Sequence, residues 1–120
     1  MSNFKDLRVW IRSKNLAKKI YLITNSGEIS KDFGLRDQMR RSAVSIASNI
    51  AEGDESGTDK QGVRFFHIAK GSSAELYTQL ILAEEIGYLD KKNKDELLDD
   101  CEAISSMLQN LINARLNKTR

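Results

Sequence analysis

The chain has 120 residues, 40% of them hydrophobic and 30% charged, with a formal net charge of +2 and no proline. This length suits one domain with its own hydrophobic core, so we expect a single domain over residues 1–120. The lone cysteine, Cys101, excludes an internal disulfide and fits a reducing compartment. No apolar run approaches the length of a membrane span and no signal peptide opens the sequence, which favours a cytoplasmic protein without a membrane partner.

Charge is distributed unevenly along the chain. Residues 1–41 carry ten Lys and Arg against four Asp and Glu, whereas residues 71–114 carry three against nine. A basic flank and an acidic flank fit a nucleic-acid ligand on the basic side, or head-to-tail pairing of copies into a ring. Charge segregation by itself leaves both alternatives open.

Apolar residues recur at helical spacing in four stretches, without a strand pattern or an internal repeat. Short loops that contain glycine separate these stretches. The spacing predicts helices over residues 7–24, 35–52, 60–87 and 94–116. Four helices with short connections indicate an all-α fold, an antiparallel up-down-up-down four-helix bundle.

The first predicted helix, residues 7–24, is basic beside its apolar stripe. Few acids are available to pair with its Lys and Arg, whereas an exposed helix ordinarily mixes signs through i, i+4 pairs. A solvated helix face gives a similar pattern, so that alternative stays open. The second helix begins with a further basic run. The candidate nucleic-acid-binding residues on these two helices are Arg8, Arg12, Lys18, Lys19, Arg36, Arg40 and Arg41.

Small and polar residues replace leucine in residues 42–53 of the second helix and around Ser72 of the third. Gly71 in mid-helix costs about 1 kcal/mol relative to alanine, so we expect a close backbone contact with the second helix to offset it. We expect Gly53 to end the second helix as its C′ residue. Buried polar groups require hydrogen-bond partners, so we expect the polar residues of these two helices to pair in a buried or half-buried polar seam. The role of this seam could be structural or functional. The residues of this seam are Asn49, Glu52, Arg64, Ser72 and Glu75.

Patterns of catalytic and metal-binding residues are weak. The sequence has one histidine, His67, and lacks the Glu-x-x-His pairs of di-iron bundles. It also lacks a nucleophile elbow and a Gly-rich phosphate loop, so we expect no catalytic residue, no metal and no cofactor. Arg64 and His67 are closer together than in the Arg–His motif of HEPN ribonucleases, which makes a four-helix ribonuclease the remote alternative. Cys101 lies on an apolar stripe, which favours a core position.

Four segments together resemble one known family. They are Phe4-Lys-Asp-Leu-Arg-Val-Trp10, Gly34-Leu35 with Gln38, Ser45-Ile-x-Ser-Asn-Ile-Ala-Glu-Gly53, and Arg64-Phe65 followed by Ala69-x-Gly-Ser-x-x-Glu75-Leu76. Over residues 4–113 the chain resembles the four-helix-bundle family of 23S rRNA intervening-sequence proteins. The third segment is the most specific of the four.

The resemblance implies a bundle that assembles into a homopentameric ring and has no established catalytic activity. Members of the family are encoded in sequences inserted within ribosomal RNA genes, or elsewhere in bacterial genomes. The accessory variability protein of diversity-generating retroelements looks similar, and it is a pentamer that binds nucleic acid and partners a reverse transcriptase. The present sequence departs from the pattern in two places: residues 25–32 lack proline, and Asp54 and Glu55 stand where basic residues are usual.

These observations lead to one expectation and one main alternative. We expect a non-enzymatic homo-oligomer that binds RNA or DNA with low specificity through its first two helices, because contacts to phosphates carry no sequence information. The alternative is a protein–protein interaction scaffold without nucleic-acid binding, in which the charges pair one subunit with another or with a protein partner.

Overall fold

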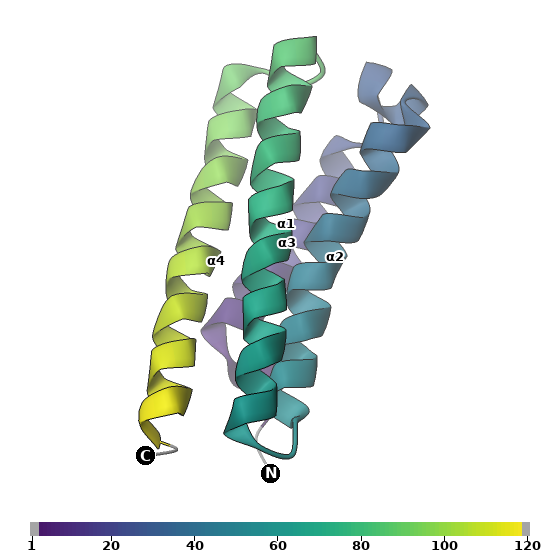
Figure 1. Ribbon diagram of the computed structural model, residues 1–120. Coiled ribbons are helices and arrows are strands. Elements are labelled where there is room, and N and C mark those ends of the chain that lie inside the picture. The colour runs from purple at the N-terminus through teal and green to yellow at the C-terminus, as the bar shows by residue number, and fades with distance from the viewer. Residues whose placement is uncertain (1–2, 119–120) are drawn as a thin grey trace.

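The computed structural model describes residues 3–118, and within this range it contains four α-helices, two short 3-10 helices and no strand. The α-helices form a four-helix bundle that extends 49 × 21 × 19 Å along its principal axes (Figure 1). The predicted all-α class is therefore confirmed. The elements are η1 (Phe4–Asp6), α1 (Arg8–Ile23), η2 (Glu28–Lys31), α2 (Phe33–Glu55), α3 (Asp59–Ile86) and α4 (Lys91–Lys118).

Side-chain caps and one glycine fix several helix ends. Asp32 Oδ1 accepts a hydrogen bond of 3.1 Å from the Leu35 N–H at the start of α2. Thr58 Oγ1 accepts one of 3.2 Å from the Gln61 N–H at the start of α3. Gly87, with a φ of +97°, ends α3 in the left-handed conformation that glycine adopts without steric cost.

The prediction that Gly53 ends the second helix is wrong, because α2 continues to Glu55 and buries Gly53 inside it. A Cβ at Gly53 would overlap the Phe66 ring, and a Cβ at Gly62 would lie 2.6 Å from the Gly53 carbonyl oxygen. These two glycines bring the backbones of α2 and α3 into contact. The close approach expected at Gly71 therefore occurs elsewhere: Gly71 is exposed, and a Cβ there would have no neighbour within 4 Å.

All four helices contribute fully buried side chains to a single core. Two buried hydroxyls, one on α1 and one on its C-cap residue, are satisfied locally: Ser13 Oγ donates to the Val9 carbonyl and Thr24 Oγ1 to the Ile20 carbonyl. Cys101 lies in the core as predicted, and burial raises the pKa of its thiol to about 12. The largest core side chains are Phe66, Leu16, Ile20, Ile29, Met39, Ile46, Ile50, Leu76, Leu80, Ile104, Leu108 and Ile112.

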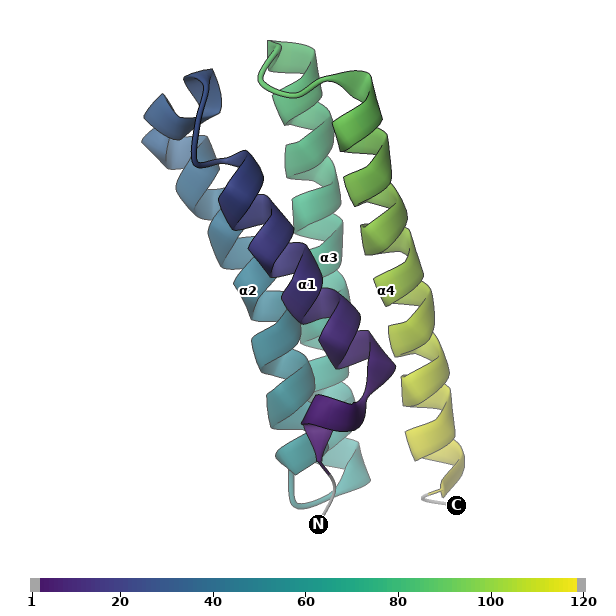
Figure 2. The same cartoon turned by 180° about the vertical axis from the view of Figure 1, so that it is seen from behind.

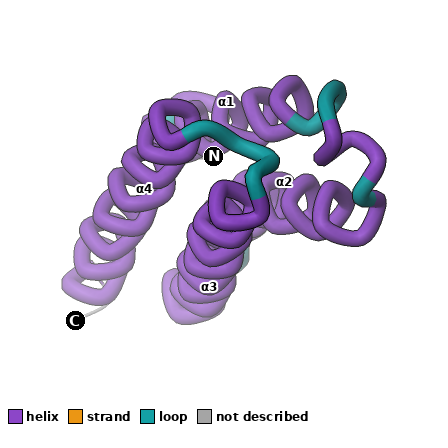
Figure 3. The backbone as a smooth tube through the Cα atoms, turned by 90° about the horizontal axis from the view of Figure 1, so that it is seen from above, coloured by secondary structure: helices purple, strands orange, loops and turns teal. Residues whose placement is uncertain are grey.

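The two ends of the bundle differ. At the end that holds the α2–α3 loop, which we term the closed end, α2 and α3 pack against each other (Figure 1). At the opposite end, which we term the open end, the α1–α2 pair diverges from the α3–α4 pair (Figure 2). Viewed along the bundle, α1 lies between α2 and α4 and is the shortest of the four helices (Figure 3). One hydrogen bond of 3.0 Å, from Tyr88 Oη to Asp32 Oδ2, links the two pairs at the open end.

Candidate nucleic-acid interface

The seven predicted basic residues do not form one continuous patch, because they point in different directions around α1 and α2. Arg12 and Lys19, seven residues apart on α1, both face α4 and bind the same carboxylate. Arg12 Nη2 lies 3.0 Å from Asp100 Oδ1, and Lys19 Nζ lies 2.9 Å from Asp100 Oδ2. The Asp100 side chain is only 11% exposed. Part of the positive charge of α1 is thus neutralised by α4.

Arg40 on α2 reaches across to the C-terminal end of α1. Its Nε donates a hydrogen bond of 2.9 Å to Thr24 Oγ1, and its guanidinium carbon lies 4.6 Å from the centroid of the Tyr21 ring. The Tyr21 side chain remains 46% exposed. The Arg40 guanidinium is therefore held in place by α1, while part of the Tyr21 ring stays open to solvent.

Arg36, one turn before Arg40, has a similar environment. Its guanidinium carbon lies 4.7 Å from the centroid of the Phe33 ring, and Phe33 is 64% exposed. Arg36 Nη1 donates to the Ser30 carbonyl at 3.0 Å, and Nε lies 2.9 Å from Asp37 Oδ1. These bonds fix the orientation of the side chain. The exposed carboxylate of Asp37 reduces the positive charge at this position.

The remaining three predicted residues, Arg8, Lys18 and Arg41, are exposed and form no ion pair with any residue between 3 and 118. Arg41 lies apart from the other two, in a shallow groove between α2 and α3 that also contains Ile68 and Glu75. The open positive charge of α1 and α2 is therefore distributed over more than one face.

The polar contact between α2 and α3 is smaller than predicted. Ser45 Oγ and Ser72 Oγ lie 2.9 Å apart and share a hydrogen bond. Asn49 Nδ2 donates to the Ser45 carbonyl at 2.8 Å and to Ser45 Oγ at 3.0 Å. These three residues satisfy one another, and Asn49 bonds within its own helix rather than across the interface. They form the polar seam of the subunit.

The predicted burial is wrong for the other members of the seam, since Glu52, Arg64 and Glu75 are all exposed. Each is placed farther around its helix than the residues that touch the opposite helix. A carboxylate or guanidinium at such a position remains hydrated and needs no protein partner. The sequence motif places these residues next to the interface but does not bury them.

A buried ion pair at the closed end was not predicted. The Asp54 side chain is 1% exposed, and its Oδ1 lies 2.7 Å from Arg115 Nη2 on α4. The Arg115 guanidinium carbon also lies 5.4 Å from the centroid of the Phe66 ring, and Nη1 lies 4.0 Å from Asp59 Oδ1. The acidic residue that departs from the family pattern is thus a structural contact between α2 and α4.

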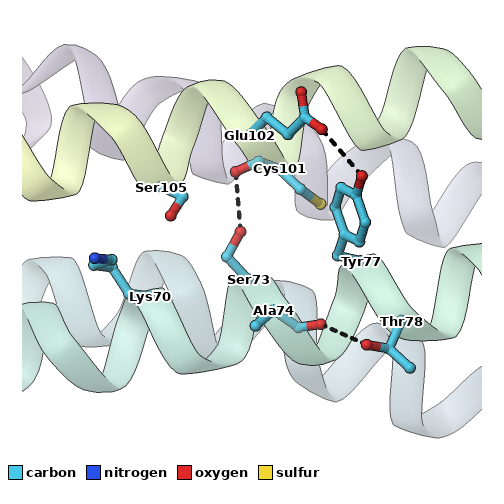
Figure 4. Close-up of a pocket in the computed structure, with 8 residues that line it drawn as sticks. All are labelled: Lys70, Ser73, Ala74, Tyr77, Thr78, Cys101, Glu102 and Ser105. Carbon is cyan, nitrogen blue, oxygen red and sulfur yellow. Dashed lines mark hydrogen bonds between the residues drawn. The ribbon is translucent and has the colours of Figure 1, made fainter.

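A groove of about 360 Å³ lies between α3 and α4, away from the basic helices (Figure 4). Ser73 Oγ donates to the Cys101 carbonyl at 3.1 Å, and Tyr77 Oη donates to Glu102 Oε1 at 3.0 Å. The bond to Glu102 raises the pKa of Tyr77 above its ordinary value. Because these polar groups bind each other, the groove favours a structural role. Its lining residues are Lys70, Ser73, Ala74, Tyr77, Thr78, Cys101, Glu102 and Ser105.

Other classes of site find little support in residues 3–118. Within them, no group of three or more His, Cys, Asp and Glu side chains is placed to hold a metal ion. His67 is exposed on α3, as is Arg64. No helix in the described range is both long enough and apolar enough to cross a membrane.

Comparison with known proteins agrees with the sequence resemblance. The crystal structure of a protein of unknown function from the S23 ribosomal protein family of Bacteroides thetaiotaomicron VPI-5482 is similar in fold, with a TM-score of 0.79. The two chains are 23% identical, and the match covers 87% of this chain and 97% of that chain. No curated protein matches the sequence. The family model of the 23S rRNA-intervening sequence proteins matches residues 5–110, and the chain therefore belongs to this family.

Proposed function

We propose that the protein binds RNA or DNA with low sequence specificity through α1 and α2. The observation that carries this proposal is a set of cations on these helices with no acidic partner in the described part of the chain: Arg8, Lys14, Lys18, Arg40 and Arg41. Exposed Lys and Arg bind phosphates and release counterions, so affinity falls log-linearly with salt. Each phosphate contact adds about −0.9 to the slope on duplex DNA, so the measured slope counts the cations on the face that binds.

A salt series tests this proposal. Nuclease-treated protein is titrated against a labelled RNA and a labelled DNA at several salt concentrations. We expect binding at low salt that weakens steeply as salt rises. Charge reversal of Lys14 and Lys18, which are exposed on α1 and form no ion pair in the described residues, to glutamate should remove most of the affinity. Reversal of Lys60 and Lys92, which are exposed on α3 and α4, serves as the matched control.

We further propose that antiparallel, up-down-up-down bundles assemble into a ring-shaped homo-oligomer, with five copies as the family resemblance implies. The outer face of α3 supports self-association, because Ile68, Leu82 and Ile86 are exposed there at helical spacing. Gly71 lies on the same helix, and no atom of its own subunit comes close enough to require a glycine at this position. Light scattering tests the proposal: a mass of 13.6 kDa at micromolar concentration would contradict it.

A protein–protein scaffold is the competing function. It is favoured by the use of Arg12 and Lys19 in ion pairs, which shows that some of the basic charge serves helix–helix contacts. Absence of nucleic-acid binding at low salt, with an intact oligomer, would support this function. The basic and acidic flanks would then bind other subunits or a protein partner.

We propose that the protein is not an enzyme and acts in the cytoplasm. A buried thiol at Cys101 suits a reducing compartment. Prolonged incubation with labelled RNA should leave the RNA intact. Cleavage that is lost in both Arg64→Ala and His67→Ala would instead support a ribonuclease, because these two residues are exposed on one helix.

A further inference from the structure

The exposed aromatic rings of α1 and α2 lie beside cations, and this arrangement suggests a ligand more specific than a phosphate backbone. Tyr21 and Phe33 each carry a guanidinium within 5 Å of the ring centroid and are still largely exposed. Exposed aromatic rings beside cations offer a surface on which an unpaired base can stack. Neither ring is needed to fill the core of the subunit.

Both pairs lie on adjoining surfaces at the open end. Arg36 and Arg40 are one turn apart on α2, about 6 Å along the axis of that helix. Arg40 joins α2 to Tyr21 of α1, and Figure 2 shows the end of α1 beside the start of α2. The two rings are thus presented by rigid helices whose positions are fixed by a hydrogen bond between them.

The cations continue along α1. Lys14, Lys18 and Tyr21 stand at i, i+4 and i+7, which places them on one face of the helix. Both lysines are exposed and form no ion pair within residues 3–118. We term the combined surface the basic–aromatic strip. It comprises Lys14, Lys18, Tyr21, Phe33, Arg36 and Arg40.

We propose that the basic–aromatic strip binds single-stranded nucleic acid, with unpaired bases stacked on Tyr21 and Phe33 and phosphates bound by the neighbouring cations. Single-strand binding proteins combine such stacking platforms with a positively charged path for the backbone. In a duplex the faces of the bases are occupied by their neighbours, so these rings would contribute little. The inference rests on the proposed function and specifies its ligand as single-stranded rather than duplex.

The test compares the affinity for a single-stranded oligonucleotide with the affinity for a duplex of the same length, both measured at the same salt concentration. We expect tighter binding of the single strand, and a loss of about 5- to 150-fold for that ligand in Tyr21→Ala or Phe33→Ala. Duplex affinity should change much less. Leu22→Ala, beside Tyr21 and 65% exposed but not aromatic, is the matched control and should leave both affinities unchanged.

Asp37→Asn separates charge from stacking. The substitution removes the carboxylate that lies 2.9 Å from Arg36 Nε, so affinity for both ligands should rise while their ratio stays constant. Circular dichroism confirms that each variant folds. Salt-dependent binding with no single-strand preference and no effect of either ring would overturn this inference and leave the proposed function intact. Absence of binding to any nucleic acid at low salt would overturn both.

Discussion

The closed and open ends of the bundle are built from different interactions. At the closed end, Gly53 and Gly62 let two helix backbones touch, and the buried Asp54–Arg115 pair joins α2 to α4. At the open end the helix pairs diverge around a core that still buries Ile29 and Leu89, and the surface there carries exposed cations, aromatic rings and the Tyr88–Asp32 hydrogen bond. The closed end is thus held by buried contacts between α2, α3 and α4, whereas the open end presents cations and aromatic rings that a ligand could contact.

The largest effect is expected at the buried ion pair of the closed end. Arg115→Met removes the guanidinium from a carboxylate that is almost fully buried, and should lower the free energy of unfolding by about 3–5 kcal/mol. Urea denaturation measures the change. The double variant Asp54→Asn/Arg115→Met should be more stable than Arg115→Met alone, because the buried negative charge is gone. Equal stability of these two variants would show that the charge is not the cause.

Gly62→Ala tests the backbone contact between α2 and α3. The added Cβ would lie 2.6 Å from the Gly53 carbonyl oxygen, so the helices must separate, at a cost of about 1–3 kcal/mol. The matched control is Gly71→Ala, measured on the dissociated subunit, where a Cβ meets nothing and helix propensity favours alanine by about 1 kcal/mol. Thermal unfolding should therefore shift in opposite directions for the two variants. A shift in the same direction would contradict the assigned contact.

Asp100→Asn tests the ion pairs between α1 and α4. Both partner cations are exposed and can be rehydrated, so we expect a loss of only about 1–2 kcal/mol. The same change frees Arg12 and Lys19 for phosphate. Nucleic-acid affinity should rise, and the salt slope should steepen by up to about 1.8. An unchanged slope would mean that this face of α1 lies outside the binding surface.

The hydrogen bond at the open end should make stability depend on pH. The bond to Asp32 raises the pKa of Tyr88 above its ordinary value of 10.0. A group with a raised folded-state pKa stabilises the protein below its unfolded pKa, and the effect is lost as pH rises through the folded value. Tyr88→Phe should therefore lower the thermal midpoint at neutral pH. The difference from the wild-type chain should shrink above pH 10 and disappear once the pH passes the raised folded-state pKa.

The smallest effect is expected at Glu52. This residue is exposed on α2, so Glu52→Ala should change the free energy of unfolding by less than about 0.5 kcal/mol. A larger loss, seen only at concentrations where the protein is oligomeric, would indicate that Glu52 contacts another subunit. Dilution below the association range then separates the two contributions.

Much of the fold could be predicted because helical periodicity reports which side chains face the core. The apolar stripes located all four helices to within a few residues, and the stripe containing Cys101 placed that thiol in the interior. Gly53 was misassigned because glycine is common both after helix ends and at close helix contacts. A local pattern cannot distinguish these two roles.

The candidate site was harder to predict because it depends on contacts between helices. Neither Arg–aromatic pair was predicted from the sequence. Arg36 stacks on Phe33 within one helical turn, and Arg40 stacks on Tyr21 of a different helix. The pairing of Arg12 and Lys19 with Asp100 likewise requires knowing which face of α1 meets α4. Glu52 and Glu75 lie next to buried positions on their helices. Neighbouring positions on a helix differ in burial, and the sequence pattern alone did not resolve which of them face the partner helix.

The measurement that tests the central claim most directly is the binding of a labelled single-stranded RNA across a salt series. We predict binding at low salt and a log–log slope of about −2.8, as expected for the four cations of the basic–aromatic strip on single-stranded nucleic acid. A chain that fails to bind RNA or DNA at low salt, while folded and assembled, would contradict the claim and favour the protein–protein scaffold.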